Sequence, residues 1–213
     1  VWLHAVSLGE TRAAQPLVDA LRRRWPQMQL LLTTGTATGW DAGLALLKPG
    51  DRHGWVPLDT PGAVNRFLKT HRPDVGVLME TETWPQLLAA AHSLGVPMVL
   101  ANARLSERSL RKGDRWPSLT RPMMASLSLV LAQSEADAQR LIQGGARPEC
   151  VVVCGQLKVD LTPAPALLER GRQWHSEWSL GRRRIVLAAS WRGGEDEPLL
   201  KACVAAGTDY ADL

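Results

Sequence analysis

Residues 74–85 read DVGVLMETETWP, an apolar segment followed by two carboxylates, a tryptophan and a proline. The run from Asp74 to Leu78 is short, apolar and rich in valine, which is typical of a buried strand in a parallel sheet. From Trp84 to Leu94, leucine and alanine recur with helical spacing. We therefore predict that Glu80 to Thr83 form a strand-to-helix turn, which in open α/β sheets lies at the ligand-binding edge.

The two carboxylates of this turn, Glu80 and Glu82, have two explanations. Either acid could simply cap the next helix, because carboxylates are favourable at a helix N-terminus. Two carboxylates this close also repel each other, which lowers stability unless a cationic group binds beside them. The pair therefore favours a functional site over a cap.

A third carboxylate, Glu10, occupies an equivalent place near the start of the chain. Val1 to Val6 is an extended apolar run, and Thr11 to Trp25 has an amphipathic helical pattern with Arg22 to Arg24 facing outward. If the first and fourth strands are neighbours, Glu10 lies close to Glu80. An ionised carboxylate in that place is suited to removing a proton from an alcohol.

Strands and helices alternate along the chain, which predicts an α/β fold with a Rossmann-like, doubly wound parallel sheet. The predicted organisation is a Rossmann-like domain at 1–160, a linker at 161–183, and at 184–213 the first strand-helix unit of an incomplete second domain. The strand of that unit is expected at 185–189. The strands of the first domain are expected near residues 1–6, 29–34, 54–57, 74–79, 96–101, 127–132 and 150–154.

The turn Thr33–Gly39 follows the second expected strand and is rich in hydroxyls and glycine. It lacks the lysine of a P-loop and the spacing of a dinucleotide fingerprint, so its phosphate-binding signal is weak. A plain helix N-cap is the favoured interpretation.

Composition limits the classes of partner. The 213-residue chain has a net charge of +4, and its cations gather at 22–24, 104–121 and 182–184, which favours an anionic partner. No nucleic-acid-binding motif is visible, so nucleic acid is not expected. The three cysteines and five histidines show neither disulfide nor metal-ligand spacing, which predicts a reducing compartment and no metal. The sequence shows no signal peptide and no apolar run of the ~20 residues that a membrane span needs.

The segment 102–122 interleaves cationic and apolar side chains and has two interpretations. It could be a solvated helical face over the edge of the core. It could instead be a surface for an anionic lipid or a membrane, since cationic and aromatic residues together suit a phosphate-bearing interface. Its members are Arg104, Leu105, Arg108, Leu110, Arg111, Lys112, Arg115, Trp116, Leu119 and Arg121.

Several stretches together resemble the N-terminal half of the 3-deoxy-D-manno-octulosonic acid (Kdo) transferases, which attach Kdo to a lipid A precursor in Gram-negative lipopolysaccharide synthesis. The similarity covers nearly all of residues 1–200, and the stretches occur in the family's order. They are His4–Glu10, Pro57–Leu68, Met79–Pro85, Ala101–Ser109, Ala132–Asp137 and Gly155–Asp160.

The resemblance implies a GT-B enzyme that is inverting and metal-independent, and needs no cofactor beyond its donor substrate, CMP-Kdo. It implies that this half binds the lipid acceptor at the cytoplasmic face of the inner membrane, and that a membrane anchor precedes the half and a donor-binding domain follows it. Glu10 corresponds to the catalytic base, and Glu80 and Lys158 to residues that stabilise the transition state. Glu82, Arg104 and Arg108 are further candidates for acceptor binding, with an internal ion pair favoured for Arg104.

Some positions depart from the family's pattern. Residues 190–193 read SWRG where many members have a threonine-histidine pair, and Gln156 and Val159 replace residues that are commonly Asn and Phe. These departures affect the donor contacts that can be inferred and do not disturb the fold. Because the family's membrane anchor would precede this half and its donor-binding half would follow it, the resemblance implies that this half is inactive alone. Two other classes remain open: another GT-B transferase or nucleotide-sugar epimerase with the same layering, and a non-catalytic module that binds anionic lipid.

Overall fold

A computed structural model describes residues 1–161, 163, 165–179, 187–190 and 192–205. The chain divides into two compact units, Val1–Leu161 and Thr162–Leu213. The expected strand at 185–189 lies partly outside the described residues, and residues 187–189 are irregular. Trp191, within the departing segment 190–193, also lies outside them.

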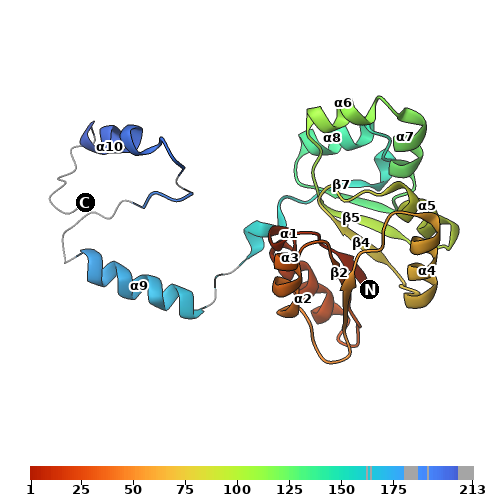
Figure 1. Ribbon diagram of the computed structural model, residues 1–213, viewed down its shortest axis with the longest axis horizontal. Coiled ribbons are helices and arrows are strands. Elements are labelled where there is room, and N and C mark those ends of the chain that lie inside the picture. The colour runs from red at the N-terminus through yellow and green to blue at the C-terminus, as the bar shows by residue number, and fades with distance from the viewer. Residues whose placement is uncertain (162, 164, 180–186, 191, 206–213) are drawn as a thin grey trace. The chain divides into compact units, whose positions relative to one another are not determined.

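The first unit is built on a parallel sheet of seven strands in the order β3-β2-β1-β4-β5-β6-β7 (Figure 1). This order is that of a doubly wound α/β sheet, as the alternating sequence pattern predicts. The strands are β1 (Trp2–His4), β2 (Leu31–Thr34), β3 (Arg52–Trp55), β4 (Gly76–Met79), β5 (Met98–Ala103), β6 (Leu129–Ala132) and β7 (Val151–Val153). Each falls within or beside a predicted strand.

Helices cover both faces of the sheet, and most begin at a residue that favours a helix start. Serine or threonine side chains cap four of them, and proline stands in the first turn of several others. The helices of the first unit are α1 (Leu8–Ala13), α2 (Gln15–Arg24), α3 (Ala37–Leu44), α4 (Pro61–His71), α5 (Pro85–Ser93), α6 (Glu107–Gly113), α7 (Pro117–Ala125), α8 (Glu135–Gln143) and the short 3-10 helices η1 (Pro148–Cys150) and η2 (Leu157–Asp160).

Alternate side chains of the strands enter two separate cores. Trp2 and Leu78 pack with α4, α5, α7 and α8, whereas Leu3 and Met79 pack with α1, α2 and Leu46, which follows α3. Figure 1 shows α1 to α3 on one side of the sheet and α4 and α5 on the other. Because both faces of the sheet are covered, the central strand β4 reads GVLM and is buried throughout, which explains the continuous apolar run before Glu80.

The single helix predicted over Thr11–Trp25 is wrong, because the structure has α1 and α2 in its place. Pro16 lies in the first turn of α2, where its missing N–H costs nothing, but within one continuous helix its ring would clash with the carbonyl of Arg12. The outward orientation predicted for Arg22 is also wrong. Its side chain is 10% exposed and forms an ion pair with Asp51, which is 4% exposed.

The second unit contains two helices among its described residues, α9 (Pro165–Ser179) and α10 (Asp196–Ala205). Within α9, Trp174 and Trp178 stack one turn apart with ring centroids 5.5 Å from each other. Helix α9 lies within the segment 161–183 that the sequence analysis assigns to a linker.

Candidate functional site

The candidate site lies where the sheet changes winding direction. Strand β1 pairs with β2 on one side and β4 on the other, so the turns after β1 and β4 are neighbours at the carboxyl edge of the sheet. In open α/β sheets such a switch point is where ligands bind. The turn after β1 leads to Glu10, and the turn after β4 carries Glu80 and Glu82, so the neighbouring strands that the sequence argument required are present.

Glu10 is held by its own turn. One carboxylate oxygen accepts a hydrogen bond from the Ser7 hydroxyl at 2.8 Å, and the other accepts one from the Val6 N–H at 2.9 Å. Ser7 in turn caps α1. These contacts keep a partly exposed carboxylate in one orientation at the switch point, which a general base requires.

Helix α3 approaches this turn closely at Thr36 and Gly39. Thr36 caps α3, and its hydroxyl also donates to the Val6 carbonyl at 3.0 Å, so the N-cap interpretation of this turn is confirmed. A Cβ on Gly39 would lie 2.7 Å from the same carbonyl. A larger side chain at Gly39 would therefore push against the backbone that positions Glu10.

Beneath the turns, His4 of β1 contacts both Thr33 of β2 and Trp84 at the start of α5. Its side chain is fully buried, its Nδ1 lies 3.0 Å from the Thr33 hydroxyl, and its ring meets the edge of Trp84 at a centroid distance of 6.3 Å. Burial lowers the pKa of His4, while the Thr33 carbonyl and the charge of Glu10 oppose that shift. His4 is therefore a neutral support for the site at neutral pH.

Glu80 adopts a backbone conformation that is unusual for its residue type. Its φ is 56°, and its N–H donates to the Ala101 carbonyl of β5 at 2.9 Å. Its carboxylate accepts a hydrogen bond from Arg104 Nε at 2.8 Å, which is the internal pair favoured for Arg104. Non-glycine residues in the left-handed region are uncommon and gather at functional sites.

Glu82 is fixed by the tryptophan that follows it. Its carboxylate accepts a hydrogen bond from Trp84 Nε1 at 2.9 Å, and Trp84 touches His4. Helix α5 begins directly afterwards and is capped by Asp59, whose carboxylate accepts from the N–H groups of Gln86 and Leu87. Asp59 therefore sets where the acidic turn ends, a role that sequence reasoning missed.

Lys158 is an exposed residue of η2, and this short helix contacts α1 and α2. The Leu157 N–H donates to the Asn102 side chain at 3.2 Å, and the Asn102 carbonyl accepts from Gln133 at 2.9 Å. Asn102 is 5% exposed with a φ of 53°, a region that asparagine tolerates better than most residues. Sequence reasoning missed Asn102 as the connection between β5 and the turn of Lys158.

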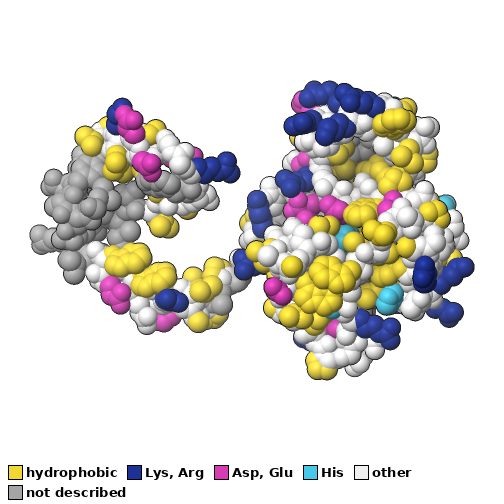
Figure 2. Space-filling model, in the orientation of Figure 1, with side chains coloured by type: hydrophobic (Ala, Val, Ile, Leu, Met, Phe, Trp, Pro, Cys, Tyr) yellow, Lys and Arg dark blue, Asp and Glu magenta, His cyan; other side chains and the backbone are white. Residues whose placement is uncertain are grey.

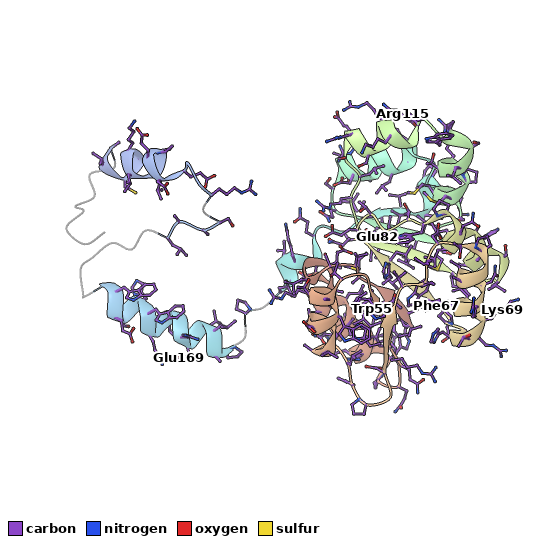
Figure 3. The ribbon with its side chains drawn as sticks, in the orientation of Figure 1. Trp55, Phe67, Lys69, Glu82, Arg115 and Glu169 are labelled. Carbon is purple, nitrogen blue, oxygen red and sulfur yellow. The ribbon has the colours of Figure 1, made fainter. Side chains whose placement is uncertain are left out.

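The two remaining candidate groups differ in their surroundings. Arg104 is 61% exposed and lies beside Glu80. Arg108 is exposed on α6 and takes part in none of the ion pairs found among the described residues. Figure 3 shows Glu82 near the middle of the first unit and Arg115 at the top of the same unit, beside α6. The structure brings Arg104 to the acidic turn and places Arg108 on the neighbouring helix.

The part of the chain that the structure describes lacks two other kinds of functional feature. No helix there is both long and apolar enough to cross a membrane. No cluster of three or more His, Cys, Asp or Glu side chains there could hold a metal ion.

Three histidines with lowered pKa values are expected to make the free energy of unfolding depend on pH. Burial lowers the pKa values of His4, His53 and His71 in the folded chain. Below the unfolded value of about 6.5, the unfolded state binds more protons, so the free energy of unfolding is highest above this pH and falls as the pH decreases. Urea unfolding between pH 7.5 and 5.0 is expected to show this loss, with a smaller loss in His4→Gln. The control is His92→Gln, because His92 is exposed. If His4→Gln loses as much free energy of unfolding between pH 7.5 and 5.0 as the unmodified chain does, burial does not lower the pKa of His4.

Solved structures with similar folds include a glycosyltransferase and a UDP-GlcNAc 2-epimerase. A glycosyltransferase from Rickettsia africae ESF-5 aligns over 98% of this chain and 58% of its own, with a TM-score of 0.62 and 13% identity. The UDP-GlcNAc 2-epimerase from Methanocaldococcus jannaschii aligns over 97% of this chain and 63% of its own, with a TM-score of 0.61 and 16% identity. The first unit therefore has the Rossmann-like fold of a GT-B N-terminal domain.

Sequence comparison gives the family. A family model described as 3-Deoxy-D-manno-octulosonic-acid transferase (kdotransferase) matches residues 1–161. The 3-deoxy-D-manno-octulosonic acid transferase of Bordetella pertussis is 45% identical over 95% of this chain and 47% of its own length, and that of Haemophilus influenzae is 34% identical over 100% and 50%. The chain belongs to the Kdo transferase family, and it spans about half the length of the curated relatives it matches.

Proposed function

We propose that this chain is the acceptor-binding half of an inverting, metal-independent glycosyltransferase that moves Kdo from CMP-Kdo to a lipid A precursor. The observation that carries the proposal is the position of Glu10 at the switch point, where Ser7 and Val6 hold its carboxylate within a family whose named members are Kdo transferases. The donor-binding groups belong to a second domain, so this half is inactive alone.

In the proposed reaction, Glu10 removes the proton from an acceptor hydroxyl as that oxygen attacks the anomeric carbon of Kdo. A new carbon–oxygen bond forms on the face opposite the leaving group, and the bond to CMP breaks with its electron pair on the phosphate oxygen. Lys158 offsets negative charge on the Kdo carboxylate or the departing phosphate. Glu80, oriented by Arg104, stabilises positive character on the sugar ring.

The proposed partner surface is the basic surface, which comprises Arg108, Arg111, Lys112, Arg115 and Trp116. All five side chains are exposed on α6 or just after it, and Trp116 is 69% exposed. Figure 2 shows Lys and Arg side chains gathered over this end of the unit. Cations beside an indole suit an anionic lipid interface, which we assign to the cytoplasmic face of the inner membrane.

The test is transfer of Kdo from CMP-Kdo to a tetra-acylated lipid A precursor. We expect transfer by a version extended through a complete second domain and none by this chain alone, because the donor site lies outside it. Absence of transfer by the extended protein would overturn the proposal. Lipid binding without transfer would favour a non-catalytic module, and turnover of a UDP-sugar would favour an epimerase.

A further inference from the structure

An irregularity at the end of β5 contacts both the acidic turn and the turn of Lys158. The pairing of β5 with β6 shifts its register between Leu100 and Ala103, and Asn102 within this stretch has a φ of 53°. Bulges of this kind re-aim side chains and are frequent next to active sites. A non-glycine residue with positive φ persists only where its surroundings hold it in place. The contacts of this β5 bulge, residues 101–103, therefore indicate what its strain serves.

Towards β4, the end of β5 holds Glu80 at two points. The Ala101 carbonyl accepts a hydrogen bond from the Glu80 N–H at 2.9 Å. Arg104, which directly follows β5, donates from its Nε to the Glu80 carboxylate at 2.8 Å. The backbone and the side chain of Glu80 are thus both fixed by the segment 101–104. The position of this carboxylate is therefore set from β5 as well as from its own strand.

The same bulge holds the turn of Lys158 through the side chain of Asn102. Its Oδ1 accepts a hydrogen bond from the Leu157 N–H at 3.2 Å, across 55 residues of sequence. Only the oxygen of the amide can accept this N–H, so the orientation of the Asn102 side chain is defined. Among the described residues, this is the only hydrogen bond that joins η2 to a distant part of the chain. Lys158 is exposed, so its place depends on how this short helix is held.

Gln133, which follows β6, fixes the backbone of the bulge. Its N–H donates to the Ala103 carbonyl at 2.9 Å, and its side chain donates to the Asn102 carbonyl at 2.9 Å. Asn102 is 5% exposed, and hydrogen bonds shielded from water are electrostatically stronger than exposed ones. With its backbone held by Gln133, Asn102 presents its side chain to Leu157 in one orientation. The bulge therefore connects Glu80 and the turn of Lys158 through fixed hydrogen bonds.

We propose that Asn102 is the positioning residue that places Lys158 relative to Glu80 for Kdo transfer. This inference rests on the proposed function, since it concerns how the cation of that reaction is held. Asn102 touches neither the donor nor the acceptor in this role and acts through Lys158. Electrostatic stabilisation of a transition state requires charges that are in place before the reaction begins. A displacement of about 1 Å can lower the rate about 10²-fold, so loss of the bond between Asn102 and Leu157 is expected to lower turnover.

The first test measures amide hydrogen exchange at Leu157 in this chain, and it needs no enzymatic activity. In Asn102→Gly the side-chain acceptor is lost, but glycine keeps a positive φ without strain. The Leu157 amide should exchange about tenfold faster or more in this variant, because its hydrogen bond is gone. Asn102→Asp keeps an oxygen acceptor and also tolerates positive φ, so slow exchange at Leu157 should be retained. The Ala138 amide of α8 is the internal control and should be unchanged.

The second test is a double-mutant cycle on kcat for Kdo transfer in the protein extended through a complete second domain. Asn102→Gly should lower kcat about tenfold or more while changing the KM for the acceptor much less. In a Lys158→Ala background, the same substitution should lower kcat by no more than about twofold, because the group that Asn102 positions is absent. A purely structural role of Asn102 would instead lower kcat equally in both backgrounds.

Two results would overturn the inference. One is unchanged exchange at Leu157 in Asn102→Gly, which would show that Asn102 does not hold η2. The other is a kcat that Asn102→Gly does not lower, or lowers equally with and without Lys158, in variants that thermal unfolding shows to be folded. The proposed function fails separately, if the unmodified extended protein transfers no Kdo. The exchange result then still decides whether Asn102 holds the turn of Lys158.

Discussion

Replacing Glu10 with glutamine in the extended protein is expected to lower kcat for Kdo transfer by about 10²-fold or more, because a general base contributes 10²–10⁴-fold. The amide keeps the shape of the side chain and can still accept from Ser7 or Val6, but it cannot take a proton. The measurement is steady-state transfer at saturating CMP-Kdo and lipid acceptor. The KM for the acceptor should change much less than kcat.

A matched control separates catalysis from stability at this position. Ser7→Ala removes the N-cap of α1 and one hydrogen bond to Glu10 but leaves the carboxylate in place, at a cost of about 1 kcal/mol in stability. Its kcat should fall far less than that of Glu10→Gln. If Glu10→Gln transfers Kdo at the original rate while remaining folded, Glu10 is not the base and another group removes the proton from the acceptor.

The sequence pattern was sufficient to locate Glu10 and Glu80, because both follow a strand at the point where a helix begins: Glu10 lies in the first turn of α1, and Glu80 lies in the turn before α5. In a parallel sheet that pattern places a residue at the carboxyl edge, and the pairing of β1 with β4 makes the two turns neighbours. Lys158 could not be found in this way. It lies on a short 3-10 helix after the edge strand β7, and only the family resemblance nominated it.

Contacts between residues distant in sequence account for what the pattern missed. Helical periodicity assigns Arg22 to the outer face of α2, but a long arginine side chain can turn inward when a carboxylate is available, and Asp51 is 29 residues further along. Asn102 and Asp59 likewise act through backbone N–H groups of other elements. Side-chain spacing within one element carries no information about such partners.

The second large effect is expected at Asp51, where Asp51→Ala should lower the free energy of unfolding by about 3–5 kcal/mol, as is typical when one partner of a buried ion pair is removed. Asp51 is 4% exposed and pairs with Arg22 of α2. Its two oxygens also accept from the N–H groups of Leu30 at 2.8 Å and Lys48 at 2.7 Å. The variant leaves a buried guanidinium without its counter-charge and two N–H groups without their acceptor. Urea unfolding followed by circular dichroism is the measurement.

Glu107→Ala provides the comparison, because Glu107 pairs with Arg111 at 3.6 Å with both side chains more than 70% exposed. Its loss should change the free energy of unfolding by no more than about 0.5 kcal/mol, since exposed pairs are screened by water. The double variant Arg22→Met/Asp51→Ala should recover part of the stability lost in Asp51→Ala, because it removes the unpaired buried charge. Equal losses in Asp51→Ala and Glu107→Ala would show that burial does not strengthen the Arg22–Asp51 pair. A large loss that the double variant relieves would establish the pair as the connection that holds α2 against the starts of β2 and β3.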